Sequence, residues 1–292
     1  VGTGRQAYSF LNMGAKAIDH YDISKEHVKS FNNFLKGKHA PITSTNADLC
    51  VHKLPPKKFD YVYLSGIVHH FKNTAVGLKN CARAVKVKGK IWLHIYRSGT
   101  FHWLALQMIR ELIEFKELEK FFLSFALIFD DGNTTNEISS SLMDDLFVPS
   151  LNLYSISEYE KFMECLGFEI SGEANTKPKG KLNLYSAHHT ANYAFKRVRD
   201  INIQTVDTGK LLTPKNSVNQ LDINFQKDKD AIKAINLYYE LKDDLKKPKN
   251  TIVKFSLIIA LHRLDVSKNS YLKKNPPRNS KLLIDILNSI KK

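Results

Sequence analysis

The stretch Val1-Gly2-Thr3-Gly4, read together with Asp22, decides the fold that we expect for this chain. Alternating glycines let the backbone turn tightly and approach a ligand closely, which a Cβ would prevent. Asp22 ends a predicted strand at 16–22, and its spacing from Gly4 is close to the roughly 20 residues that separate a glycine-rich phosphate loop from a ribose-binding acid. Because such a turn follows a strand and none precedes it here, we expect the chain to begin inside a nucleotide-binding motif.

The first half of the chain alternates between predicted strands and predicted helices. Ser24 stands where an N-cap accepts the free amides of a helix, and 59–64 is a mostly apolar run typical of a strand buried on both faces. The predicted helices span 5–13, 24–37, 74–85, 101–129 and 157–166, and the predicted strands span 16–22, 59–64, 90–96, 168–172 and 182–188. This alternation predicts an open α/β sheet with helices on both faces and a ligand crevice at the carboxyl ends of the strands.

Changes in composition along the chain predict two domains. Residues 1–189 are expected to form the sheet domain, with 97–150 as an apolar helical insert that covers the crevice or binds an acceptor. Residues 190–292 are expected to form a Lys-rich, mainly helical extension that begins with an irregular polar stretch at 190–226. The C-terminal helices are candidates for contact with a second copy or with another partner.

The composition argues against several classes of protein. The chain has 292 residues and 43% hydrophobic content, which suffices for a substantial core. It contains no run of about 18 apolar residues that would predict a transmembrane helix. Its three cysteines are widely spaced, which favours a reducing compartment over a disulfide framework or a zinc site. We therefore expect a cytoplasmic protein without a bound metal.

The formal net charge of +15 raises the question of a nucleic-acid partner. The lysines are scattered, arginine is scarce, and no aromatic and basic RNA-binding signature occurs. A solvated basic surface is the simpler interpretation, and RNA modification stays open as an alternative.

Taken together, these segments resemble the class I S-adenosylmethionine-dependent methyltransferases over residues 1–189. The glycine turn resembles the second half of that family's first motif, whose acidic residue and first glycine would lie upstream of Val1. Tyr21-Asp22-Ile23-Ser24 is similar to the end of the second strand, and Ala47-Asp48-Leu49 to the turn after the third. Ser65-Gly66-Ile67-Val68-His69-His70 resembles the Gly-x-x-His-His turn after the fourth. The resemblance implies a Rossmann-like fold that lacks its first strand, and we expect such a chain to bind the cofactor poorly.

The resemblance also implies which residues bind S-adenosylmethionine. Asp22 would accept hydrogen bonds from both ribose hydroxyls, and Asp48 would lie at the turn that meets the adenine. The implied cofactor-binding residues are Gly2, Thr3, Gly4, Asp22, Ile23, Asp48, Leu49, Ser65 and Gly66. The chain departs from the family at His20 and Tyr21, where small residues are usual.

Methyl transfer from a sulfonium is an in-line displacement, so the protein mainly positions the acceptor and excludes water. A base is needed only if the acceptor must lose a proton, and His69 and His70 are candidates, with packing or hydrogen bonding as the alternative role. Tyr96 and Arg97 stand at the end of the predicted strand 90–96, where they can meet an acceptor; the alternative is that they only begin the insert. The function implied by the resemblance is methyl transfer to a small-molecule or lipid-like acceptor. A noncatalytic scaffold protein and an RNA-modifying methyltransferase are the alternatives.

Overall fold

The computed structural model describes residues 4–98, 100, 103, 106–107, 110, 148–173 and 190–213. The chain divides into two units, and every helix and strand named below belongs to the first, which comprises Val1–Arg97, Ser150–Lys177 and Thr190–Lys215. The predicted strand at 182–188, the helices predicted beyond residue 226 and most of the predicted insert at 97–150 lie outside the described residues.

The N-terminal part of this unit is a pair of parallel strands with two helices. Its elements are α1 (Arg5–Asn12), β1 (Ile18–Asp22), α2 (Lys25–Leu35) and β2 (Ile42–Asn46). The register of the pair places Asp22 opposite Asn46, so both strands end at the same edge. Ser24 caps α2 as predicted, because its hydroxyl oxygen accepts the backbone N–H of His27 over 3.2 Å.

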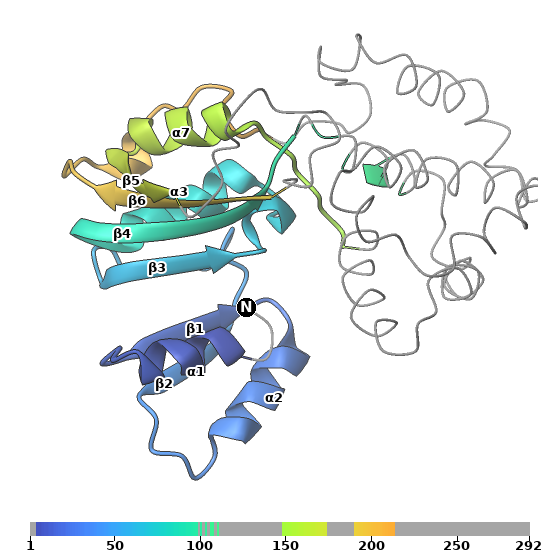
Figure 1. Ribbon diagram of the computed structural model, residues 1–292, viewed down its shortest axis with the longest axis vertical. Helices are drawn as coiled ribbons and strands as arrows, with labels where there is room; N and C mark the ends of the chain where they lie inside the picture. Colours follow the sequence, from blue (N-terminus) through green and yellow to red (C-terminus); the bar gives the residue numbers. More distant parts are fainter. Residues whose placement is uncertain are drawn as a thin grey trace, which may run out of the picture. The chain divides into compact units, whose positions relative to one another are not determined.

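The rest of the unit is a four-stranded mixed sheet. Its elements are β3 (Phe59–Ser65), the 3₁₀ helix η1 (Val68–His70), α3 (Thr74–Ala84), β4 (Val85–Tyr96), α7 (Ile156–Cys165), β5 (Phe168–Glu173), β6 (Thr190–Arg197) and the 3₁₀ helix η3 (Ile203–Thr205). The strand order is β3-β4-β6-β5, with β3 and β4 parallel and β6 antiparallel to both of its neighbours (Figure 1). The carboxyl ends of β3 and β4 therefore lie at one edge of this sheet.

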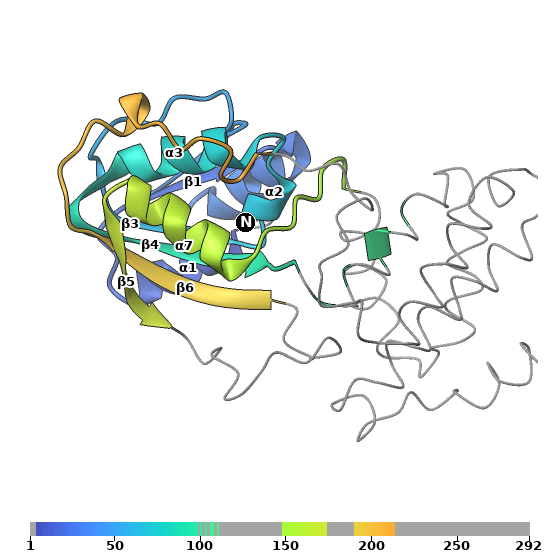
Figure 2. The ribbon, with the colours of Figure 1, turned by 90° about the horizontal axis from the view of Figure 1, so that it is seen from above.

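The core lies between this sheet and two helices that cover the same face of it, α3 and α7 (Figure 2). Ile91, Leu93 and Ile95 of β4 alternate with less buried neighbours and are fully buried. They belong to the same hydrophobic cluster as Leu78 of α3 and Phe162 of α7. None of the helices in the described part of the chain is long and apolar enough to cross a membrane.

The described strands form two sheets, whereas we predicted a single open one. β1 and β3 each have one edge that no strand among the described residues pairs with. At the edge of β3, the ring of Phe10 from α1 packs edge-on against Tyr61 and Tyr63, with ring centroids 5.9 and 4.9 Å apart. Side-chain contacts thus take the place of a shared hydrogen-bond ladder, and the α/β character of the prediction is confirmed.

The four-stranded sheet extends beyond residue 189, where we predicted that the sheet domain ends. β6 pairs with β4 from Thr190 opposite Tyr96 to Lys196 opposite Lys90, in a segment that we predicted to be irregular. Alternate residues of β6 are buried, from Ala191 to Arg197, as in a strand with one face toward a core. The predicted boundary therefore falls just before the strand that joins β4 to β5.

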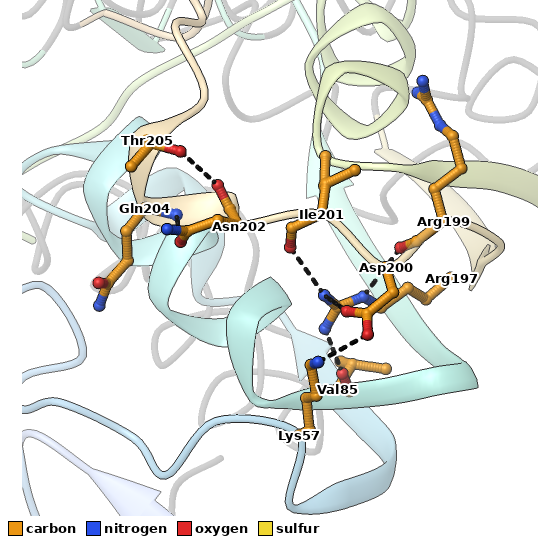
Figure 3. Close-up of polar contacts among 9 residues, drawn as sticks. All are labelled: Lys57, Val85, Arg197, Arg199, Asp200, Ile201, Asn202, Gln204 and Thr205. Atoms are coloured by element: carbon orange, nitrogen blue, oxygen red, sulfur yellow. Dashed lines mark hydrogen bonds and ion pairs between the residues drawn. The ribbon is translucent and has the colours of Figure 1, made fainter.

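Arg197, at the end of β6, is 1% exposed, and each of its three side-chain nitrogens has a hydrogen-bond partner (Figure 3). Its Nη1 donates to the carbonyl oxygen of Val85 over 2.7 Å. Nε donates to the carbonyl of Arg199 over 3.3 Å, and Nη2 to that of Ile201 over 3.2 Å. The Asp200 carboxylate lies 3.4 Å from Nη2 and supplies the opposite charge. A buried guanidinium stabilises a fold only when its donors are satisfied in this way, and this one fastens the chain after β6 to the start of β4.

Candidate functional site

Asp22 lies at the carboxyl end of β1, where the predicted ribose-binding acid belongs. Its side chain is only 11% exposed, and Oδ1 accepts the backbone N–H of Ser24 over 2.8 Å. Its carbonyl oxygen accepts the N–H of Ala47 over 2.9 Å and the Nδ2–H of Asn46 over 3.0 Å. These bonds tie the ends of β1 and β2 together, so the carboxylate is held by the backbone around it.

Asp48 follows β2 at the same edge of the parallel pair. Its Oδ1 accepts the N–H of Cys50 over 2.8 Å, which makes a turn of the kind that aspartate favours. The residues that follow the two acids differ in exposure. Ile23, after Asp22, is 71% exposed, whereas Leu49, after Asp48, is 8% exposed and belongs to the hydrophobic core. The structure thus brings Asp22 and Asp48 to one edge and gives Leu49 a packing role.

The backbone turns sharply after β3 at Ser65 and Gly66. Gly66 adopts a φ of 69°, the left-handed region that favours glycine, and its N–H donates to the carbonyl of His94 over 3.2 Å. A Cβ added at Gly66 would meet no atom within 4 Å. Glycine is therefore favoured here for its backbone conformation, and among the described residues the space beside it is open to the close approach of another group.

Gly4 is the one residue of the predicted glycine turn that falls among the described residues, since Gly2 and Thr3 lie outside them. It has a φ of 80°, and a Cβ at this position would overlap the ring of Phe31 from α2. A cavity of about 410 Å³ lies beside it, lined by Gly4, Arg5, Tyr8, Ser9, Ser30, Phe31 and Phe34. This cavity lies between α1 and α2, and neither Asp22 nor Asp48 lines it.

His69 is fully buried in η1, between the ends of β3 and β4. Its Nδ1 accepts the backbone N–H of Tyr96 over 3.2 Å, and its ring stacks on that of Tyr96 with centroids 3.5 Å apart. Because Nδ1 accepts, the proton of the neutral ring is on Nε2. Burial, assisted by the nearby His70 and His94, holds the pKa of His69 well below its usual value of 6.5. His69 is therefore a neutral ring whose lone pair is already engaged.

His70 has the opposite arrangement. Its Nδ1 lies 3.0 Å from the carbonyl oxygen of Ser150, and a carbonyl can only accept, so Nδ1 carries the proton. The lone pair of the neutral His70 ring is then on Nε2. The ring is half-buried and meets those of His69 and Tyr96 edge-on, with centroids 4.2 and 5.9 Å away. The two adjacent histidines are thus held in different tautomers by different backbone groups.

The first third of the chain is similar to a known protein family. Residues 1–93 match the sequence profile of the family described as "Methyltransferase domain". Residues 1–93 therefore belong to a methyltransferase domain. The matched range includes Gly4, Asp22, Asp48 and Gly66, and it ends within β4, just before Tyr96.

Solved structures with similarity to the methyltransferase domain are distant in sequence. A putative methyltransferase of Bacillus halodurans is 16% identical over 59% of this chain, with a TM-score of 0.40. YcgJ of Bacillus subtilis is 16% identical over 59%, with a TM-score of 0.38, and this chain covers 62% of the length of each of these two proteins. An S-adenosylmethionine-dependent methyltransferase of Mesorhizobium loti is 14% identical, with 67% of this chain and 87% of that one covered and a TM-score of 0.43. A comparison with curated proteins gives no significant match.

The segment that holds the histidine turn of the methyltransferase domain comes from far along the chain and has no signal in the sequence. Asn152 is 8% exposed, and its N–H donates to the carbonyl of His69 over 2.8 Å. Its Nδ2–H donates to the carbonyl of Phe71 over 2.7 Å. Together with the Ser150 carbonyl that accepts from His70, these bonds hold η1 in place.

Among the residues that the structure describes, no three His, Cys, Asp or Glu side chains gather into a group that could hold a metal ion.

Proposed function

We propose that the full-length protein transfers the methyl group of S-adenosylmethionine to a small-molecule or lipid-like acceptor. The observation that carries this proposal is the placement of Asp22 and Asp48 at the ends of two adjacent parallel strands in a methyltransferase domain. Ligands of open α/β sheets bind at the carboxyl ends of the strands. Both acids are held there by backbone hydrogen bonds rather than by loose solvent-exposed contacts.

The residues around this edge fit the cofactor's adenosyl group. A carboxylate is an acceptor only, so Asp22 suits the two ribose hydroxyls, which are donors to it. Asp48 lies at the neighbouring turn, where the adenine would bind. The open space beside Gly66 admits a ligand against the backbone at the end of β3. When bound, the cofactor supplies an electrophilic methyl group, and the chain's own part is to bind, orient and exclude water.

If the acceptor loses a proton, His70 is the side chain that we assign as general base. A base must offer a lone pair, and in the neutral His70 ring the lone pair is on Nε2 because Nδ1 donates to Ser150. His69 is excluded from this role in its present arrangement, because its lone pair accepts the Tyr96 N–H and its other nitrogen carries a proton. His69 and Tyr96 instead position the turn.

The cofactor assignment is tested by calorimetric titration of the full-length protein with S-adenosylhomocysteine. Each hydrogen bond to a charged group contributes about 1.5–3 kcal/mol, so Asp22→Ala should weaken binding by roughly 10-fold to 100-fold or more. Asp22→Asn keeps an oxygen that can accept the backbone N–H of Ser24. Comparing it with Asp22→Ala separates the effect of losing the charge from the effect of loosening Ser24, the N-cap of α2. Asp60→Ala is the matched control, since Asp60 is 84% exposed on β3 and its ion-pair partner among the described residues is Lys86. No binding by the wild type would overturn the proposal.

A further inference from the structure

Arg97 follows β4 directly and is held beyond the end of that strand. Its backbone forms a parallel bridge with Tyr154, just before α7. Side chains alternate along a strand, so Arg97 points to the same face as Leu93 and Ile95, both of which are fully buried. Arg97 itself is only 2% exposed, so its guanidinium group is removed from water.

Two nitrogens of this buried group, Nε and Nη2, have no hydrogen-bond partner among the residues that the structure describes. No acidic side chain in the described part of the chain forms an ion pair with Arg97. In a guanidinium group, Nε–H and the Nη2–H beside it point the same way in one plane. They form a two-pronged donor that matches two oxygens of a carboxylate or a phosphate. The geometry of this donor edge therefore matches an oxyanion.

Arg197 shows what a buried arginine with a purely structural role looks like in this protein. It is as deeply buried as Arg97, yet three backbone carbonyls and the Asp200 carboxylate satisfy its nitrogens (Figure 3). A buried charge without such partners destabilises a fold, because water is lost and nothing replaces it. Packing alone does not account for Arg97, since an apolar side chain of similar length would fill the same space without that cost.

We propose that Arg97 binds an oxyanion, a carboxylate or a phosphate, on the methyl acceptor. This inference rests on the proposed function and narrows its acceptor to an anionic compound. Arg97 follows Tyr96, whose N–H holds His69, so it lies at the same strand end as the proposed base His70. Asp22 and Asp48, which we assign to the cofactor, lie instead at the strand ends of the other sheet, Asp22 in β1 and Asp48 in the turn after β2. The guanidinium is the anchor that orients the acceptor, and it takes no part in the proton transfer.

The experiment measures the melting temperature of the full-length protein in inorganic phosphate, in benzoate and in chloride at equal ionic strength. Because an anion that binds only the folded state stabilises it, phosphate or benzoate should raise the melting temperature of the wild type by a few degrees over chloride. Arg97→Met should abolish this rise while leaving the melting temperature in chloride at or above that of the wild type. Arg97→Lys keeps the charge but loses the two-pronged edge, and it should show a smaller rise.

Arg197→Met is the matched control for removal of a buried arginine. It should lower the melting temperature in chloride and keep the anion-dependent rise, because its loss leaves carbonyl groups unpaired but does not touch Arg97. The inference is overturned if Arg97→Met lowers the melting temperature as much as Arg197→Met does. It is equally overturned if the wild type and Arg97→Met respond to the anions alike.

S-adenosylmethionine also carries a carboxylate, so a second titration decides the source of the oxyanion. S-adenosylhomocysteine should bind Arg97→Met as tightly as it binds the wild type. Weaker binding by this variant would assign the oxyanion to the cofactor and contradict the acceptor site. If the wild type fails to bind S-adenosylhomocysteine but keeps its anion-dependent rise, the proposed function fails and the oxyanion site stands.

Discussion

The backbone N–H of Tyr96 donates a hydrogen bond to Nδ1 of His69, and the two rings stack with their centroids 3.5 Å apart. This pair joins the end of β4 to the turn that follows β3, at the strand ends where we place the acceptor. The hydrogen bond engages the Nδ1 lone pair of His69, so this nitrogen is not available to accept a proton from an acceptor molecule. The ring is neutral and has no exposure to solvent.

The burial of His69 predicts that the protein loses stability as the pH falls below about 6.5. The folded-state pKa of His69 is depressed, so the unfolded chain binds a proton that the folded chain does not, and the stabilisation is complete only above the unfolded pKa. His20 and His94 have pKa values lowered by burial and act in the same direction. Urea unfolding at pH 7.5 and 5.5 checks this, with at most about 1.4 kcal/mol per pH unit from His69. His69→Gln should reduce the loss, and an unchanged loss in that variant would contradict the assignment.

The two adjacent histidines are expected to occupy opposite tautomers at neutral pH. Nε2 of His69 and Nδ1 of His70 should carry the protons, because Tyr96 donates to the first ring and Ser150 accepts from the second. Long-range proton–nitrogen correlation spectra of the histidine rings measure this directly. Finding both rings in the same tautomer would remove the basis for choosing His70 as the base.

Gly4→Ala is predicted to destabilise the protein more than Gly14→Ala. Both glycines have positive φ, 80° and 95°, so alanine costs about 1–2 kcal/mol at either position. A Cβ at Gly4 would also overlap the ring of Phe31, whereas a Cβ at Gly14 meets nothing within 4 Å. Overpacking adds roughly 1–3 kcal/mol at Gly4 alone, measurable as a difference in the free energy of unfolding in urea. Equal losses would show that Phe31 moves aside freely.

Arg197 and Lys57 both interact with Asp200, yet we expect their replacement to differ in cost. Lys57 and Asp200 are each about half exposed and 2.7 Å apart, so Lys57→Met should change the free energy of unfolding by less than about 1 kcal/mol. Arg197→Met leaves buried carbonyl groups without donors and should cost about 3 kcal/mol or more. Thermal or urea unfolding of the two variants checks the difference, and similar losses would contradict a structural role for Arg197.

Local patterns predicted most of the described helices and strands. Ser24 before a periodic apolar segment predicted the start of α2, and the apolar run at 59–64 predicted β3. The same reasoning missed β6, because its inward-facing residues include Arg197. From sequence alone an arginine is expected to be exposed. Its burial here depends on partners such as the carbonyl oxygen of Val85, which belongs to a different strand, β4.

Some residues of the candidate site could also be predicted from local patterns, whereas others could not. Asp22 could be predicted because it ends a predicted strand at the expected spacing from Gly4, and the turn at Asp48 because it resembles the turn after the family's third strand. The Ser150 carbonyl that sets the tautomer of His70 could not be, since no periodicity relates the two positions.

From the sequence alone came the order of the strands and helices in the first half, the glycine and acid positions and the methyltransferase resemblance. These depend on interactions between near neighbours in the chain, such as capping, alternation of buried residues and tight turns. Only the tertiary structure decided that His69 and His70 hold their protons on different nitrogens. It also decided that Arg97 is buried with two nitrogens unpaired among the described residues, whereas each side-chain nitrogen of Arg197 has a partner. Desolvation and hydrogen-bond partners depend on groups from distant segments, and those groups meet only when the chain is folded.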